Sequence, residues 1–361
     1  MGDLAQLPMF TVRAVDPPLR DNRDAMELPF LSLQKGRKLP IEFAGRIKDR
    51  DVYVSVAADV RATIATIWDW DLIIFAASHL NDAIEAGLKP SSRIRFVPHD
   101  ALKQIGRGTG GKDYKELAQT IRRLRLTTVI TNIREEDGAG AEKPFSWLTD
   151  YSIPKRYSRT PMTADNHEGT PDPARPWEIE LPDWLFNSIL RRTGILAVHP
   201  DYFDLTGGLE RWLYRVARKA VPDKADVKAI KFRMQTLHER SGTTRPLRNF
   251  AVDIRRLAEA DTLPEYGLRI EKDGRNELVI LYRDNFKPTR LPRGMKKLQI
   301  DTGSRKDFIA KVRRISKKAA QPADTSNYDP SVVEQLKVKQ RILSELGQAD
   351  LINRRTRRKT H

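Results

Sequence analysis

The stretch KDYKELAQTIRRL, residues 112–124, returns in a related form as RPLRNFAVDIRRL, residues 245–257. The two stretches lie at a constant offset of 133 positions, from Lys112 to Arg245, and end in the same four residues. Their apolar residues share the spacing i, i+4 and i+7, which is one face of an α-helix: Leu117, Ile121 and Leu124 in the first, and Phe250, Ile254 and Leu257 in the second. Both stretches are therefore predicted to be amphipathic helices in the same phase.

The outward positions of these two predicted helices agree in charge as well as in phase. Four pairs of basic residues occupy matching positions: Lys112 and Arg245, Lys115 and Arg248, Arg122 and Arg255, and Arg123 and Arg256. Three apolar and four basic matches in one register are hard to ascribe to chance. They indicate a duplicated structural unit whose repeated helix is basic on its outward face.

The segments around the first stretch favour the order helix, strand, helix, helix, hairpin, and those around the second repeat the three helices and the hairpin. In the first unit, periodicity and turn residues predict these elements within residues 62–87, 93–97, 98–106, 112–124 and 126–153. In the second unit they predict helices within 207–221, 229–242 and 246–261, and a hairpin within 267–283 with Asp273-Gly274 at its tip. This order is typical of a winged helix, a helix-turn-helix variant with a β-hairpin wing. We expect an α+β, mainly helical fold with tandem winged-helix domains.

The chain then divides into five parts. Residues 1–57 are predicted to be an N-terminal arm with short strands, and residues 58–153 the first winged-helix domain. Residues 154–176, rich in Pro, Thr and charge, form a linker or long loop. Residues 177–285 form the second winged-helix domain, and residues 286–361 a basic tail that is partly helical or disordered.

The charge of the chain points to a polyanionic partner. The 361 residues carry a formal net charge of +17, which suits nucleic acid or an acidic membrane surface. Most of it lies in the tail, where 20 lysines and arginines accompany seven acidic residues. Such a tail raises non-specific affinity for DNA through counterion release, or it is simply solvated. Because the tail adjoins predicted DNA-binding domains, we expect double-stranded DNA as the partner.

Several other classes of protein are excluded or disfavoured. The chain has no cysteine, so disulfides and thiolate metal sites are excluded. Its N-terminus does not resemble a signal peptide, and its longest apolar run, Leu72–Ala77, is far too short to span a bilayer. The six histidines form no H-x-H or H-x-x-x-H cluster. We expect a cytoplasmic protein without membrane contact, catalytic residue, metal or cofactor.

The predicted contacts with DNA follow from the geometry of a helix-turn-helix. The last helix enters the major groove, where its N-terminal residues meet base edges. The candidates are Lys112, Lys115 and Gln119 in the first unit, and Arg245, Arg248 and Asn249 in the second, where Val252 could meet a thymine methyl group. Phosphate contacts are expected from Arg122, Arg123, Arg255 and Arg256, and from Arg134 and Arg275 in the wings. The alternative is a solvated basic face, with cations that complement the helix dipole.

One segment is close to a nucleotide-binding motif. Residues 106–113, GRGTGGKD, match the phosphate-loop pattern except that Asp113 replaces the hydroxyl residue. The alternative is a flexible turn before a helix, with Asp113 at the helix N-terminus. Asp69 and Asp71 do not form a convincing metal site either, because residues at i and i+2 of a helix do not face one another.

Five stretches carry a resemblance to a known family: residues 26–43, 65–80, 108–133, 201–220 and 263–270. In these stretches and their order the chain resembles the plasmid replication initiator protein A (RepA-type) family of proteobacteria. The resemblance implies a protein that binds plasmid origin repeats, helps to melt adjacent DNA, and draws in the host replication initiator and the replicative helicase. It also implies a homodimer that serves autoregulation or copy-number control. The main alternative is a winged-helix transcriptional regulator without a replication role; a nucleotide-driven origin remodeller and an architectural protein are the others.

Overall fold

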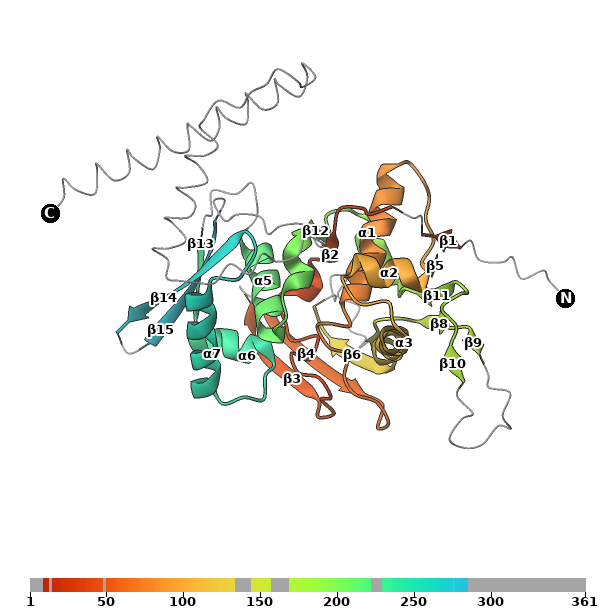
Figure 1. Cartoon of the computed structure of the whole chain (residues 1–361). Helices are drawn as coiled ribbons and strands as arrows, with labels where there is room; N and C mark the ends of the chain where they lie inside the picture. The colour runs from red at the N-terminus through yellow and green to blue at the C-terminus, as the bar shows by residue number, and fades with distance from the viewer. Residues whose placement is uncertain are drawn as a thin grey trace, which may run out of the picture. The chain divides into compact units, whose positions relative to one another are not determined.

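The computed structural model describes residues 9–12, 15–47, 50–133, 144–156, 169–221, 229–274 and 276–284. The chain divides into two units, residues 1–290 and 291–361, and all described residues belong to the first. This first unit is compact and mixes helices and strands (Figure 1). The predicted tail, residues 286–361, lies outside the described residues.

The first half of this unit contains the predicted helices. They are α1 (Asp71–Glu85), α2 (Pro98–Gln104) and α3 (Gly111–Leu126). β6 (Thr127–Thr131) follows α3 directly and pairs with β7 (Phe145–Ser146). The hairpin β3 (Ile41–Ile47) and β4 (Arg50–Ala58) extends this pair to an antiparallel sheet of order β3-β4-β6-β7.

Two boundaries differ from the prediction. α1 begins at Asp71 rather than near Ala62, because the backbone before it bonds elsewhere: Ile64 N–H donates to Arg37, and Ile67 N–H to Ser32. The hairpin predicted within residues 126–153 has, in place of its second strand, two strands in different sheets. After β7 the chain turns at the buried Trp147, and β8 (Asp150–Ser152) joins a four-stranded sheet of order β1-β5-β11-β8. Its other strands are β1 (Phe10–Thr11), β5 (Arg93–Phe96) and β11 (Trp177–Glu180).

The second half has the three predicted helices and the predicted hairpin. They are α5 (Gly208–Ala220), α6 (Met234–Ser241), α7 (Leu247–Ala260), β14 (Tyr266–Asp273) and β15 (Asn276–Arg283). The sequence prediction missed β13 (Ala229–Arg233), which was assigned to the start of a helix. β13 alternates between exposed and half-buried residues and pairs with β15, giving a three-stranded sheet of order β13-β15-β14. Pairing with the distant β15 thus overrides the local helical preference.

Short elements complete the unit. They are β2 (Arg20–Asn22) paired with β12 (Ile195–Ala197), β9 (Lys155–Arg156) paired with β10 (Thr170–Pro171), α4 (Asp183–Leu190), and the 3₁₀ turns Asp24–Met26 and Pro200–Asp204.

The buried apolar residues of both halves form one continuous core. Every residue of α1 from Asp71 to Asn81 is buried. The predicted N-terminal arm also contributes to this core, since Asp21, Asn22 and Met26 are each 0% exposed. The Asp21 carboxylate accepts a 2.6 Å hydrogen bond from Arg215 Nε of α5, so this segment is bound to the second half.

Gly242 ends α6 in the left-handed conformation, with φ of 61°. A Cβ atom there would lie 2.6 Å from Pro29 Cβ and 2.8 Å from Ile41 Cγ2. Gly242→Ala is therefore expected to lower stability by about 1–3 kcal/mol through crowding and backbone strain, measured by chemical denaturation. Gly87→Ala is the control, because Gly87 has φ of 78° but nothing within 4 Å, so only strain remains. Equal losses in the two variants would contradict the predicted crowding.

Candidate nucleic-acid interface

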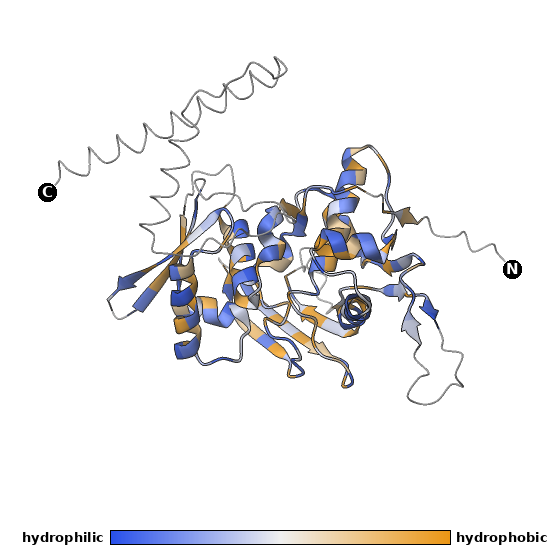
Figure 2. Ribbon diagram, viewed as in Figure 1, coloured by the Kyte–Doolittle hydropathy of each residue, from blue (hydrophilic) through white to orange (hydrophobic). Residues whose placement is uncertain are grey.

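The repeated stretches form α3 and α7, and the predicted apolar faces are confirmed. The positions i, i+4 and i+7 are buried in both helices, except that the last one in α7, Leu257, is only partly buried. Figure 2 shows both hydrophilic and hydrophobic residues along α7. Because these apolar residues pack against the core, the rotation of each helix about its axis is fixed, and with it the direction of its basic residues.

The first turns of α7 present the predicted base-contacting residues to solvent. Arg248 and Asn249 are exposed, and Val252 is 38% exposed although it is apolar. Arg245 lies before the helix, whose N-cap is Pro246, and its Nε is 3.2 Å from Asp253 Oδ2. Arg248 and Asn249 are therefore the better placed of the three predicted residues.

A groove of about 660 Å³ lies between α7, the start of α6 and the tip of the β14–β15 hairpin. Four basic residues line it, Arg233, Arg248, Arg255 and Lys272, together with one carboxylate, Glu277. The excess of cations makes this groove attractive to a polyanion. Arg275, predicted to contact phosphate at this tip, lies outside the described residues, as does Arg134 in the other hairpin.

Arg255 is already paired within the fold, with Glu277. Its Nε and Nη2 donate to the two Glu277 oxygens at 3.1 and 2.7 Å, a two-bond arrangement that joins α7 to β15. These hydrogen bonds raise the pKa of Arg255. Arg256, the next residue, is exposed.

In α3 the residues predicted to contact bases are also exposed: Lys112, Lys115 and Gln119. The glycine-rich segment before them follows helix α2 and leads into α3, which starts at Gly111. The Asp113 carboxylate accepts a 3.0 Å hydrogen bond from Gly110 N–H and so caps the helix. This geometry agrees with the prediction of a turn before a helix, because the Asp113 carboxylate is hydrogen-bonded to the backbone.

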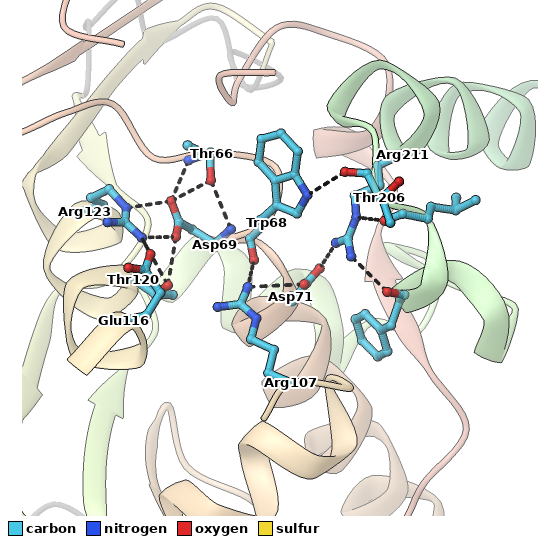
Figure 3. A network of polar contacts seen from close by, with 12 residues as sticks. Thr66, Trp68, Asp69, Asp71, Arg107, Glu116, Thr120, Arg123, Thr206 and Arg211 are labelled. Carbon is cyan, nitrogen blue, oxygen red and sulfur yellow. Dashed lines mark hydrogen bonds and ion pairs between the residues drawn. The ribbon is translucent and has the colours of Figure 1, made fainter. Parts of the chain in front are cut away.

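Arg123 of α3 is bound to carboxylates. Its Nε and Nη2 donate to Asp69 at 2.9 and 2.7 Å, and Nη2 also lies 2.6 Å from Glu116 Oε1 (Figure 3). Burial lowers the pKa of Arg123, but the hydrogen bonds and charges of Asp69 and Glu116 outweigh it and raise the pKa. A phosphate contact from Arg123 would require this pair to break. The adjacent Arg122 is half-buried.

Asp71 joins the two halves of the unit. Its carboxylate lies 2.6 Å from Arg211 Nη1 of α5 and 3.3 Å from Arg107 Nη2, in the segment before α3 (Figure 3). Burial raises the pKa of the Asp71 carboxyl, and the two guanidinium groups oppose this shift. Asp69 and Asp71 thus bind separate arginines. The sequence patterns did not identify either set of partners, because the arginines lie between 36 and 140 residues away.

The described part of the chain offers neither a group of metal ligands nor a membrane-spanning helix. No three His, Asp or Glu side chains there are grouped so that they could hold a metal ion. None of the described helices is both long and apolar enough to cross a membrane.

Comparison with known proteins finds a matching family, a curated relative and similar solved structures. A family model described as replication initiator protein A matches residues 20–268. A curated protein of Wigglesworthia glossinidia brevipalpis, named "Putative replication protein", is 28% identical over 249 residues, which cover 68% of this chain and 82% of that protein. A crystal structure of domains 2 and 3 of RctB superposes with a TM-score of 0.53 at 14% identity, covering 71% of this chain and 95% of that chain. At this identity the structural match concerns the fold alone.

Proposed function

This chain belongs to the replication initiator protein A family, and from that premise we propose that it initiates plasmid replication by binding double-stranded origin repeats. In this proposal it promotes opening of the adjacent duplex and draws in the host replication initiator and the replicative helicase. It acts in the cytoplasm on plasmid DNA, can form a homodimer, and performs no catalytic step itself. The observation that carries the proposal is the pair Arg248 and Asn249, exposed in the first turns of α7 beside a basic groove.

The proposal treats each half of the body as a winged helix. The order α5, β13, α6, α7, β14 and β15, with β15 between β13 and β14, supports this for the second half. The order α1, β5, α2, α3, β6 and β7 supports it for the first half. The matched phase of α3 and α7 supports equivalent positions for the two helices.

Base recognition would follow from α7 in the major groove. Arg248 suits the O6 and N7 atoms of guanine, and Asn249 suits the N6 and N7 atoms of adenine. Val252 offers an apolar surface to a thymine methyl group. Lys112, Lys115 and Gln119 on α3 would contact a second groove segment. Two linked contacts multiply affinity through effective concentration, and binding to adjacent repeats would strain the origin DNA.

Phosphate contacts would come from other residues. Arg256 is exposed on α7, and Lys272 is exposed and lines the groove. Arg122, Arg123 and Arg255 are weaker candidates, since Arg123 and Arg255 are bound to carboxylates and Arg122 is half-buried. Such contacts set the position of the protein on the duplex without reading its sequence.

The test is fluorescence anisotropy with the DNA that flanks the gene, against scrambled duplex of equal length, across a salt series. A large preference for the flanking DNA at physiological salt is expected, because base contacts persist when phosphate contacts are screened. Equal affinities with a steep salt slope would contradict sequence-specific binding.

A transformation assay separates initiation from transcriptional regulation: the gene with its flanking DNA should maintain a plasmid that has no other origin.

Glu277→Gln is expected to strengthen DNA binding. The change removes the carboxylate from the groove and releases Arg255, so affinity should rise roughly three- to tenfold and the salt slope should steepen by about one unit. Both effects should appear with flanking and scrambled duplex alike. Glu271→Gln is the matched control. Glu271 pairs with Lys231 on the opposite face of the hairpin, so this change should leave affinity nearly unaltered. Weaker binding by Glu277→Gln would contradict the assignment of the groove.

A further inference from the structure

The turn Gln34-Lys35-Gly36-Arg37-Lys38 carries three cations in five residues and precedes β3. Gly36 has φ of 76°, which allows the chain to reverse there. Lys35, Gly36 and Lys38 are exposed. The role of this turn is not explained by either predicted winged helix.

Arg37 fixes the turn in place. Its Nε donates to Leu39 O at 2.9 Å, Nη2 to Pro40 O at 2.8 Å, and Nη1 to Gly242 O at 2.5 Å. The Arg37 carbonyl in turn accepts from Ile64 N–H at 2.9 Å. Gly242 belongs to the connection between α6 and α7. The turn is therefore held against the segment that leads into the proposed base-reading helix.

Lys35 extends the same turn toward the other half of the body. Its Nζ lies 5.2 Å from the centre of the Trp68 ring, a cation–π contact. Lys35 and Gly36 line a cavity of about 550 Å³ together with Arg123 and Glu116 of α3. One five-residue turn thus contacts the segment before α7 on one side and shares a cavity with α3 on the other.

The charges of Lys35 and Lys38 have no counterpart within the described segments. No ion pair joins either lysine to a described carboxylate. Asp69, Asp71 and Glu116 share the cavity with Lys35, but each of them is paired with an arginine. Arg37 behaves differently, because its guanidinium is used by three carbonyl groups. Arg37 therefore holds the turn in place, whereas Lys35 and Lys38 form no ion pair with a described carboxylate and can bind a ligand.

We propose that Lys35 and Lys38 bind duplex phosphates between the two segments contacted by α3 and α7. The proposal rests on the proposed function. The DNA backbone must pass between two neighbouring groove contacts, and ammonium groups on a fixed turn bind it without reading bases. Arg37 is the positioning residue: it acts on DNA through the turn and not by contact.

The experiment measures anisotropy of the full chain with flanking and scrambled duplex across a salt series. Lys35→Ala/Lys38→Ala should weaken both complexes by the same factor, on the order of tenfold, and reduce the slope of log K against log salt by about 0.9 for each lysine. The ratio of the two affinities should not change. Lys89→Ala, an exposed lysine after α1, is the control and should leave the slope unaltered.

Arg37→Lys tests the positioning role. It keeps the charge but cannot bond three carbonyl groups in the same fork, so it should reproduce part of the loss of slope. An unchanged slope in Lys35→Ala/Lys38→Ala would overturn the proposal, as would a loss confined to the flanking duplex. If the wild-type chain had no preference for flanking DNA, the proposed function would fail, but the slope on scrambled duplex would still decide the role of the turn.

Discussion

Asp21→Asn is expected to lower the free energy of unfolding by about 3–5 kcal/mol, because it leaves a buried charge without its partner. Asp21 is 0% exposed and Arg215 1% exposed in their side chains. The Asp21 carboxylate accepts from Arg215 Nε at 2.6 Å and from Trp70 Nε1 at 2.7 Å. Asparagine has nearly the same shape, so the loss would report the missing charge and not a cavity. Urea denaturation followed by tryptophan fluorescence measures it.

A paired variant separates charge from packing. Asp21→Leu/Arg215→Met removes both charges, and it should recover much of the stability that Asp21→Asn loses, because a buried ion pair can be replaced by apolar residues at little cost. Asp59→Asn is the control, since Asp59 and its partner Arg61 are exposed and the midpoint should barely move. If Asp21→Asn were as stable as the wild type, Asp21 would not be an essential link between the N-terminal segment and α5.

Arg248→Ala/Asn249→Ala is expected to lower the preference for flanking over scrambled duplex on the order of a hundredfold. Each base contact of this kind contributes about 1–3 kcal/mol to discrimination, and the two are removed together. Affinity for scrambled duplex should fall only modestly, since one cation is lost. Both residues are exposed at the start of α7, so the fold should be preserved. Competition anisotropy at physiological salt measures the ratio directly.

Arg256→Ala is the matched control for base readout. Arg256 is exposed on the same helix but nearer its C-terminal end, where a phosphate contact is proposed. Its loss should weaken binding to both duplexes equally and reduce the salt slope by about one unit. An unchanged preference in Arg248→Ala/Asn249→Ala would show that these two residues do not read bases. Lys112, Lys115 and Gln119 of α3 would then be the next residues to substitute.

Much of this fold could be predicted from local sequence patterns. The i, i+4, i+7 spacing of apolar residues set the buried faces of α3 and α7, and therefore which basic residues face outward. The Asp273-Gly274 turn signal located the β14–β15 hairpin, and Gly242 located the end of α6. These features are predictable because helix phase, turn type and helix ends depend on residues that are neighbours in the chain.

The partners of the charged side chains were decided only by the tertiary structure. In the sequence repeat Arg122 is equivalent to Arg255, and Arg123 to Arg256. The fold binds Arg123 to Asp69 and Arg255 to Glu277, and it leaves Arg256 exposed. β13 and the burial of Asp21 have the same origin, since both depend on pairing with distant segments. By itself the sequence determined the helices, their faces and the family; which cations remain available to DNA was decided by the approach of carboxylates from remote elements, which no local pattern encodes.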